Sequence, residues 1–414
     1  MILRSMQCLA LLCAASAPIY ADIFTKHPGR LQVGPNPCSI VAEDLNADGI
    51  PDIVTADRGE MTGQGEERPA NDELSLLESE GPLNYIARPP LRAGFAPYCV
   101  VAANIDALKA PDLVVASFHD PRRRHVTLFR NLGESGFEPL TFSAPEVGLK
   151  YARMLDNDQL PLYTLPGITS LAVREMTHDE FRDVIATGWS ADALLFFPGD
   201  REKYFGDPII TPAPGGPRDV QAADLNGDGE VDLATVMYNS GEVVLWKGTG
   251  NGTFSEANRF LSGAALPNKI KLADFNGDGR TDIAVSHCFA SDSVTLFFAD
   301  TERHFTYKLQ QTETMSLNDN HERVDDEIRD LVAQDLNGDG KTDFAAACYA
   351  SARVCVFINE SQGSGAPLNF RREIYSFKDG RPRALAAADL NTDGKIDLAV
   401  ALWQINAVAF LLAQ

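Results

Sequence analysis

The feature that most constrains the fold of this chain is a nine-residue acidic loop that occurs five times. The copy from Asp224 to Asp232 places oxygen-bearing side chains at loop positions 1, 3, 5 and 9, with a glycine at position 6. Ca²⁺ takes six to eight oxygen ligands at about 2.3–2.6 Å. Glycine permits the sharp turn that aims the backbone carbonyl of position 7 at the same point. We therefore expect each complete loop to bind one Ca²⁺.

The five complete loops share one set of expected ligands at positions 1, 3, 5, 7 and 9, and position 7 contributes only its carbonyl. They are Asp44, Asn46, Asp48, Ile50 and Asp52; Asp224, Asn226, Asp228, Glu230 and Asp232; Asp274, Asn276, Asp278, Arg280 and Asp282; Asp335, Asn337, Asp339, Lys341 and Asp343; and Asp389, Asn391, Asp393, Lys395 and Asp397. Two further copies, starting at Asn104 and Glu175, keep the spacing but lose part of the set. Metal binding in those two loops is left open.

An EF-hand shares the start of this pattern but does not fit its continuation. An EF-hand needs a bidentate glutamate at position 12 and helices on both sides. Position 12 of the Asp224 loop is Thr235, which lies within an apolar run rich in β-forming residues. The sequence therefore predicts a metal loop between two strands.

The seven loops start 49 to 71 residues apart, which is the spacing of a repeat architecture. Around each loop the sequence indicates four short strands, termed A to D, with the loop joining A to B. Strand A often begins with a proline seven residues before the first loop position, as Pro217 does. We therefore predict an all-β, seven-bladed β-propeller of four-stranded blades.

The two ends of the chain predict how the ring closes. The sequence ends at Gln414, directly after the last strand C, so the last blade lacks a strand D. Residues 22–34 precede the first strand A, and Phe24 stands 13 residues before Pro37, as Phe254 stands before Pro267. We expect this segment to complete the last blade by pairing with residues 408–412, which would protect two sheet edges.

The remaining composition indicates an exported protein. Residues 1–21 resemble a secretory signal peptide, which leaves residues 22–414 as the propeller domain and predicts a secreted, periplasmic or cell-surface location. No later apolar run is long enough to cross a bilayer. A formal net charge of −22 argues against nucleic acid as a partner. Five cysteines lie beyond residue 21, and their pairing is left open.

The loop pattern between two apolar strands resembles the FG-GAP/VCBS repeat family, whose propellers include the head of integrin α subunits. The resemblance covers essentially the whole of residues 22–414. It implies a propeller with Ca²⁺ in its A–B loops, bound by the residues of the five complete loops. The family is functionally mixed, because it includes adhesion proteins, glycan-binding proteins and some enzymes, so the fold does not give the function.

The face opposite the metal loops is the expected ligand face. The long B–C and D–A connections lie there, at about residues 57–71, 119–125, 141–167 and 311–328. Aromatic residues recur 14 positions after the first loop residue, and arginines recur six positions before it. The candidate ligand-binding residues, with two histidines at similar positions, are Phe118, His119, Trp189, Arg218, Tyr238, His287, Arg329, Tyr349, Arg383 and Trp403.

Several interpretations of this face remain. The aromatic residues suit a glycan or protein ligand and the arginines suit carboxylates, but the same aromatic residues would also pack between blades. No catalytic residues are assigned, because no nucleophile–base motif and no phosphate loop is present. We predict a binding module for a protein or glycan, with a polysaccharide-active enzyme such as a lyase and a structural subunit of an envelope assembly as alternatives. The Ca²⁺ ions are expected to be structural.

Overall fold

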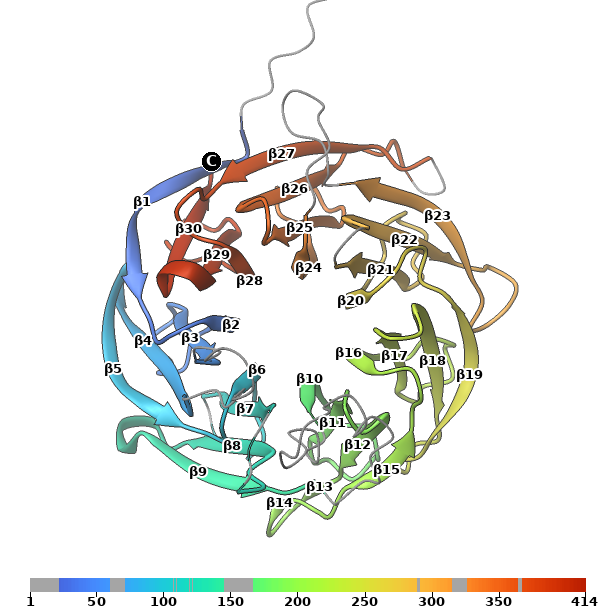
Figure 1. The fold of residues 1–414 in the computed structure, drawn as a ribbon, viewed down its shortest axis with the longest axis horizontal. Helices are drawn as coiled ribbons and strands as arrows, with labels where there is room; N and C mark the ends of the chain where they lie inside the picture. The colour runs from blue at the N-terminus through green and yellow to red at the C-terminus, as the bar shows by residue number, and fades with distance from the viewer. Residues whose placement is uncertain are drawn as a thin grey trace, which may run out of the picture.

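The chain forms a closed ring of seven four-stranded antiparallel sheets, as predicted (Figure 1). The computed structural model describes residues 22–59, 71–106, 108, 110–118, 120, 122–144, 167–288, 291–314, 326–363 and 367–414. Each sheet is one blade, and its strands run from A at the axis of the ring to D at the rim (Figure 1). Adjacent A strands contact one another around the whole ring.

The strands of the blades have the following bounds. The A strands are β2 (Pro37–Glu43), β6 (Pro97–Ala103), β10 (Ile168–Arg174), β16 (Pro217–Ala223), β20 (Pro267–Ala273), β24 (Ile328–Gln334) and β28 (Pro382–Ala388). The B strands are β3 (Asp52–Asp57), β7 (Asp112–Ser117), β11 (Asp183–Gly188), β17 (Asp232–Met237), β21 (Asp282–His287), β25 (Asp343–Cys348) and β29 (Asp397–Leu402). The C strands are β4 (Glu73–Gly81), β8 (Val126–Asn131), β12 (Ala193–Phe197), β18 (Glu242–Gly248), β22 (Ser293–Ala299), β26 (Arg353–Asn359) and β30 (Ala407–Ala413). The D strands are β5 (Asn84–Arg92), β9 (Phe137–Phe142), β15 (Ile209–Pro212), β19 (Phe254–Leu261), β23 (Tyr307–Thr314), β27 (Phe370–Ser376) and β1 (Phe24–Gln32).

Packing between neighbouring blades forms the core. Every B strand is buried along its whole length. One apolar cluster, for example, joins Ile40 and Ile53 of the first blade to Ala399 and Phe410 of the last. Strands that are buried on both faces need nearly continuous apolar sequence, which explains the runs of Val, Ile, Leu and Ala in these segments.

The A strands have an irregular start that positions side chains at the axis. In every A–B pair the register shifts near the first two residues of strand A, for example between Pro217 and Asp219. A bulge inserts one extra residue and re-aims its side chain. Two consecutive side chains can therefore reach the next A strand: Cys38 Sγ contacts the Tyr98 carbonyl at 3.4 Å, and Ser39 Oγ accepts a hydrogen bond from Val100 N at 3.2 Å.

Strand β1 completes the last blade beside β30, the place that the sequence predicts for it (Figure 1). Its pairs run from Phe24 with Ala413 to Gln32 with Ala407, with a register shift between Lys26 and Arg30. Phe24 is 1% exposed, and its N–H donates to the Tyr375 hydroxyl of the sixth blade at 3.0 Å. The N-terminal strand therefore links the last two blades.

Blade 3 departs from the other six. A short hairpin, β13 (Gly199–Asp200) with β14 (Tyr204–Phe205), stands between its strands C and D. Its strand A begins at Ile168 without a proline, as strand A of the sixth blade does at Ile328. Two 3₁₀ turns, Gly133–Ser135 and Trp403–Ile405, complete the elements of the described chain.

Three predictions concern the chain as a whole. In the described residues, no helix is long and apolar enough to span a membrane. The predicted signal peptide, residues 1–21, lies outside the described residues. The five cysteines beyond residue 21 are buried free thiols, and the closest pair, Cys348 and Cys355, has its sulfur atoms 3.5 Å apart.

Candidate functional site

The five complete A–B loops share one hydrogen-bonding pattern. The carboxylate at position 1 accepts the N–H of the position 6 glycine at 2.7–2.9 Å in all five. The oxygens at positions 3 and 5 each accept the N–H two residues further on; in the fourth blade, Asn226 accepts from Asp228 and Asp228 from Glu230. The position 6 glycines have φ between +82° and +91°, a region that favours glycine.

The aspartate at position 9 has a structural role in every blade. It is at most 1% exposed and is the first residue of strand B. One carboxylate oxygen accepts the N–H of loop position 2 at 2.7–3.1 Å. The other accepts an N–H at or next to the end of strand C at 2.7–3.0 Å. Asp112 and Asp183 make the same pair of contacts in the two incomplete loops. The position 9 aspartate therefore links strands A, B and C of a blade whether or not the loop has a complete ligand set.

Replacing one of these aspartates should destabilise the fold even in an incomplete loop. In Asp112→Ala the backbone N–H groups of Ile105 and Asn131 lose their acceptor. A buried unsatisfied donor costs about 1–3 kcal/mol, so we expect a loss of roughly 2–6 kcal/mol in the free energy of unfolding, measured by urea denaturation. The exposed Asp207→Ala is the matched control. Equal denaturation midpoints for Asp112→Ala and the unmodified protein would contradict the structural role.

The donor atoms of the loops suit Ca²⁺, but in this structure they already accept hydrogen bonds from the loop backbone. The donors at positions 1, 3 and 5 are carboxylate and amide oxygens, which are the ligands that a hard cation prefers. As folded, these oxygens accept N–H groups of their own loop, and the described part of the chain gathers no three acidic, histidine or cysteine side chains around one point. The chemistry of the donors therefore fits Ca²⁺, and binding would draw these side chains away from the loop backbone.

A basic side chain lies in or beside each of the two incomplete loops. In the second blade, Arg130 contacts Asp106 Oδ2 through Nε at 3.2 Å and Nη2 at 3.1 Å. In the third blade, His178 Nε2 lies 2.8 Å from Glu230 Oε2 of the fourth-blade loop, and this contact raises the pKa of His178. The complete fourth-blade loop also has a basic neighbour, because Lys247 Nζ lies 2.9 Å from Asp228 Oδ2, so such contacts are not confined to the incomplete loops.

A second group of side chains gathers at the other end of the ring, where A strands begin and B strands end. We call it the axial cluster. It consists of Arg58, Tyr98, Phe118, Trp189, Arg218, Tyr238, Arg329, Tyr349, Arg383 and Trp403. Six of the seven blades contribute to it, so its position on the axis follows from the symmetry of the fold.

Tyr98 lies at the centre of the axial cluster. It belongs to the second blade, and its hydroxyl accepts hydrogen bonds from Arg218 of the fourth blade and, at 3.0 Å, from Arg383 of the seventh. One blade separates the second from the fourth, and one separates it from the seventh. These contacts can therefore meet only near the axis of the ring. The Arg58 guanidinium adds a third contact, 5.4 Å from the Tyr98 ring centre.

The charges around Tyr98 are unbalanced. Burial by itself raises the pKa of Tyr98, but the guanidinium groups of Arg218, Arg383 and Arg58 lower it to about 8. Burial lowers the pKa of Arg58. Within the described residues, no carboxylate forms an ion pair with Arg58, Arg218 or Arg383, whereas Arg329 pairs with Glu327. Desolvated charges of one sign are costly unless a counter-charge is near.

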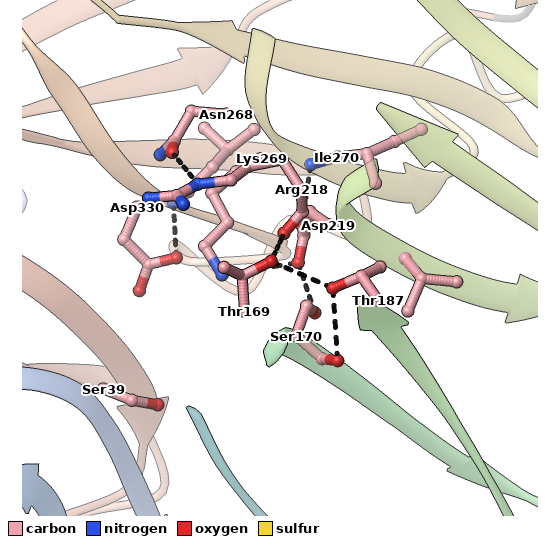
Figure 2. Close-up of polar contacts among 12 residues, drawn as sticks. Ser39, Thr169, Ser170, Thr187, Arg218, Asp219, Asn268, Lys269, Ile270 and Asp330 are labelled. Carbon is pink, nitrogen blue, oxygen red and sulfur yellow. Dashed lines mark hydrogen bonds and ion pairs between the residues drawn. The ribbon is translucent and has the colours of Figure 1, made fainter. Parts of the chain in front are cut away.

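A second layer of polar residues comes one position later in five of the A strands, at Ser39, Ser170, Asp219, Lys269 and Asp330 (Figure 2). Asp219 accepts hydrogen bonds from Ser170 Oγ at 2.5 Å and Ile270 N at 2.9 Å, and Lys269 Nζ lies 3.4 Å away. Burial lowers the pKa of Lys269, but Asp219 and Asp330 raise it by more, so it stays charged. This layer has one ammonium group and two carboxylates, so its net charge is negative, and Asp330 also helps to raise the pKa of Arg383. The axial cluster, by contrast, gathers several guanidinium groups.

The structure brings together eight of the ten predicted ligand-face residues, namely Phe118, Trp189, Arg218, Tyr238, Arg329, Tyr349, Arg383 and Trp403. His287 is not among them, because it is fully buried and its ring nitrogens lie 3.1 Å from Ser293 O and 3.0 Å from Ser262 O. His119 lies outside the described residues. Parts of the long connections do too, at residues 60–70, 121, 145–166 and 315–325.

The sequence spacing placed the aromatic and basic positions at one end of the ring, where eight of them gather, but it did not identify their centre. Tyr98 was one of several residues at the position six before the loop, and nothing in the spacing distinguished it. The second layer, with Asp219 and Lys269, was not predicted. The start of strand A at a proline marks the bulge that brings two consecutive residues to the axis, so this layer was in principle readable.

A comparison with protein-family models finds the FG-GAP-like repeat at residues 176–235, 224–285 and 335–400. These matches include four of the five complete loops and all but the first residue of the incomplete loop of the third blade. No curated protein matches the sequence significantly.

Comparison with solved structures shows the fold alone. BBS1N, crystallised in complex with ARL6DN, is 14% identical with a TM-score of 0.61, covering 95% of this chain and 98% of that one. Virginiamycin B lyase from Staphylococcus aureus is 11% identical with a TM-score of 0.57, and the match covers 94% of this chain and 100% of that one. The periplasmic gluconolactonase PpgL from Pseudomonas aeruginosa is 14% identical with a TM-score of 0.55, and the match covers 81% of this chain and 88% of that one.

Proposed function

Because this chain is a seven-bladed β-propeller that carries FG-GAP-like repeats, we propose that it is an exported recognition module that binds a glycan or protein ligand at the axial cluster. The observation that carries the proposal is the convergence of arginine and aromatic side chains from six blades at one end of the axis. Arginine and aromatic residues are the types enriched where proteins bind partners.

The partly exposed aromatic residues support ligand contact beyond inter-blade packing. Phe118 is buried, but Trp189, Tyr238, Tyr349 and Trp403 all retain partial exposure. Trp189 stacks on Phe118 with ring centres 6.0 Å apart, and its Nε1 is a buried donor without a hydrogen-bond partner in the described chain. A pre-stacked ring with a free donor suits a ligand that has both an apolar face and polar groups.

Five Ca²⁺ ions in the complete loops would support this module from the opposite face. Positions 1, 3 and 5 of each loop supply the oxygen ligands, and positions 7 and 9 supply a carbonyl and a structural carboxylate. We assign these ions to stability, since the loops and the axial cluster lie at opposite ends of the A strands. The N-terminal 21 residues would direct export.

Catalysis is the second candidate function, and Tyr98 is the observation that favours it. A tyrosine whose pKa is lowered to about 8 by arginines has the properties of a general base, and perturbed groups concentrate at functional sites. Two of the proteins that share the fold are named as a lyase and a lactonase. A polysaccharide lyase acting at the axial cluster is therefore the alternative, and a structural subunit of an envelope assembly is a third possibility.

Loss of glycan or protein binding in tryptophan variants tests the proposed function. We expect Trp189→Ala and Trp403→Ala each to weaken binding on a glycan array or in a pull-down at least tenfold, because each removes a large partly exposed contact. Tyr204→Ala, an aromatic change on the β13–β14 hairpin, is the control. Unchanged binding in both tryptophan variants would move the site away from the axial cluster, and turnover of a polysaccharide in the same assay would favour the enzyme.

A further inference from the structure

The axial cluster contains three buried or half-buried guanidinium groups that form no direct ion pair with a carboxylate in the described part of the chain, although Asp330 in the next layer raises the pKa of Arg383. Arg383 is 6% exposed, and Arg58 and Arg218 are half-buried. All three surround one phenol, and none forms an ion pair in the described part of the chain. Arg58 Nε is moreover a buried donor without a hydrogen-bond partner there. A site with several unneutralised donors is complementary to an anion.

The hydrogen bonds of the Tyr98 hydroxyl determine whether it can act as a donor or as an acceptor toward a ligand. A phenol oxygen has two acceptor lone pairs and one O–H donor. Arg218 and Arg383 each donate to this oxygen, so both lone pairs are occupied. The remaining capacity of Tyr98 is its own O–H, for which the described residues provide no acceptor. The hydroxyl is therefore a donor in the middle of three cations.

Guanidinium groups and a hydroxyl donor at this spacing match a planar carboxylate. Arginine presents N–H groups in a fork that binds both oxygens of a carboxylate at once. The aromatic residues around the same centre point to a sugar as the carrier, since the rings of Trp189, Tyr238, Tyr349 and Trp403 stand partly exposed beside the arginines. A glycan that carries carboxylates combines both requirements.

We propose that the axial cluster is a binding site for an acidic glycan. Its uronate carboxylate lies among Arg58, Arg218 and Arg383 and accepts a hydrogen bond from the Tyr98 hydroxyl. This inference rests on the proposed function and names its ligand class. The ring faces of the surrounding tryptophans and tyrosines hold the sugar next to the carboxylate. An acidic peptide would use the arginines but has no need for the aromatic residues.

A consequence of this geometry is that binding depends on pH. The charged and titratable groups that face Tyr98 are Arg58, Arg218, Arg383, Cys38, Lys269 and Tyr238. Burial raises the pKa of Cys38 to about 11 and also raises that of Tyr238, while Asp219 and Asp330 hold the pKa of Lys269 above its usual value. Tyr98, whose pKa is about 8, is therefore the group that changes charge between pH 7 and 9.5. As a phenolate it would neutralise one arginine and repel a carboxylate, so uronate affinity should fall as pH rises.

The test uses titration calorimetry of the full-length protein with galacturonate oligomers, neutral galactose oligomers of equal length and oligoglutamate. We expect the galacturonate oligomers to bind at least tenfold more tightly than either competitor. Tyr98→Phe, which keeps the ring, and Arg218→Gln should each weaken uronate binding about tenfold or more, while the exposed Arg372→Gln should match the unmodified protein. The fall in affinity from pH 7 to 9.5 should disappear in Tyr98→Phe. The melting temperature of each variant shows whether it is folded. If Arg218→Gln does not fold, the affinity of Tyr98→Phe for the galacturonate oligomers and its dependence on pH decide whether the inference holds.

The outcomes separate this inference from the proposed function. Equal binding of acidic and neutral oligomers, or unchanged uronate binding in Tyr98→Phe and Arg218→Gln while Trp189→Ala and Trp403→Ala lose binding, overturns the carboxylate site and leaves the recognition module intact. Tighter binding of oligoglutamate assigns the site to an acidic peptide and overturns the glycan. Absence of binding to every glycan and protein probe defeats both.

Discussion

Deleting residues 22–34 should lower the melting temperature of the protein by roughly 6–12 °C. The deletion removes β1, so the buried strand β30 keeps only β29 as a partner and the last blade exposes a sheet edge. It also exposes the pocket of Phe24 and frees the Tyr375 hydroxyl of the sixth blade. Several ladder hydrogen bonds and one buried aromatic side chain together contribute roughly 5–10 kcal/mol. Each kcal/mol shifts the melting temperature by about 1.2 °C in a chain of this size, because the entropy of unfolding grows with chain length.

The reference for this experiment is the chain that starts at Asp22, measured by calorimetry. Phe24→Ala in that chain should reproduce part of the loss, and Thr25→Ala, an exposed residue of the same strand, should leave the melting temperature nearly unchanged. Because β1 seals the ring, the deleted protein should also associate through its open edge. A deletion variant that melts like the reference and stays monomeric would show that the ring holds without β1.

The fold was readable from the sequence because each blade repeats the same local signals. The loop glycine, the proline at the start of strand A and the apolar strand B recur with little change, and seven such units leave a closed ring as the simplest arrangement. The role of β1 followed from the offset between Phe24 and Pro37, which equals the offset between Phe254 and Pro267. These are local patterns, and local patterns survive in a single sequence.

The chemistry of individual residues was less readable, because one residue type serves two purposes. The position 9 aspartate looks like one more metal ligand in the sequence, yet in all seven blades it accepts two backbone N–H groups. The retained Asp112 and Asp183 in the incomplete loops were the available signal. Tyr98 could not be recognised as central, since its contacts with Arg218 and Arg383 join residues 120 and 285 positions apart.

The two ends of the ring have opposite electrostatic character, and this explains the acidic composition. One end presents the carboxylates of the five loops, and the other presents Arg58, Arg218 and Arg383, which form no direct ion pair with a carboxylate among the described residues. If cations occupy the loops, repulsion among the carboxylates is offset where it is strongest. The net charge of −22 thus describes the metal-loop end more than the axial cluster, which remains suited to an anion.

Removing calcium should have the other large effect. Extracellular sites bind Ca²⁺ with dissociation constants of about 10⁻⁴–10⁻³ M, so 10 mM Ca²⁺ adds roughly 1.4–2.7 kcal/mol for each site that binds only the folded state. Five sites would therefore contribute roughly 7–14 kcal/mol, and we expect the melting temperature in excess EDTA to lie about 10 °C or more below that in 10 mM Ca²⁺. Scanning calorimetry in both buffers at one pH measures the shift.

Single-loop variants show whether the shift arises in the complete loops. Asp278→Asn removes a carboxylate from position 5 of a complete loop and should reduce the calcium-dependent shift by about one site's share. Asp179→Asn makes the same change in the incomplete loop of the third blade, so its shift should equal that of the unmodified protein. The quantity compared is the difference between the two buffers, because each substitution also changes hydrogen bonds within its loop. A protein that melts identically in EDTA and in calcium would mean that the loops are held by their own backbone N–H groups alone.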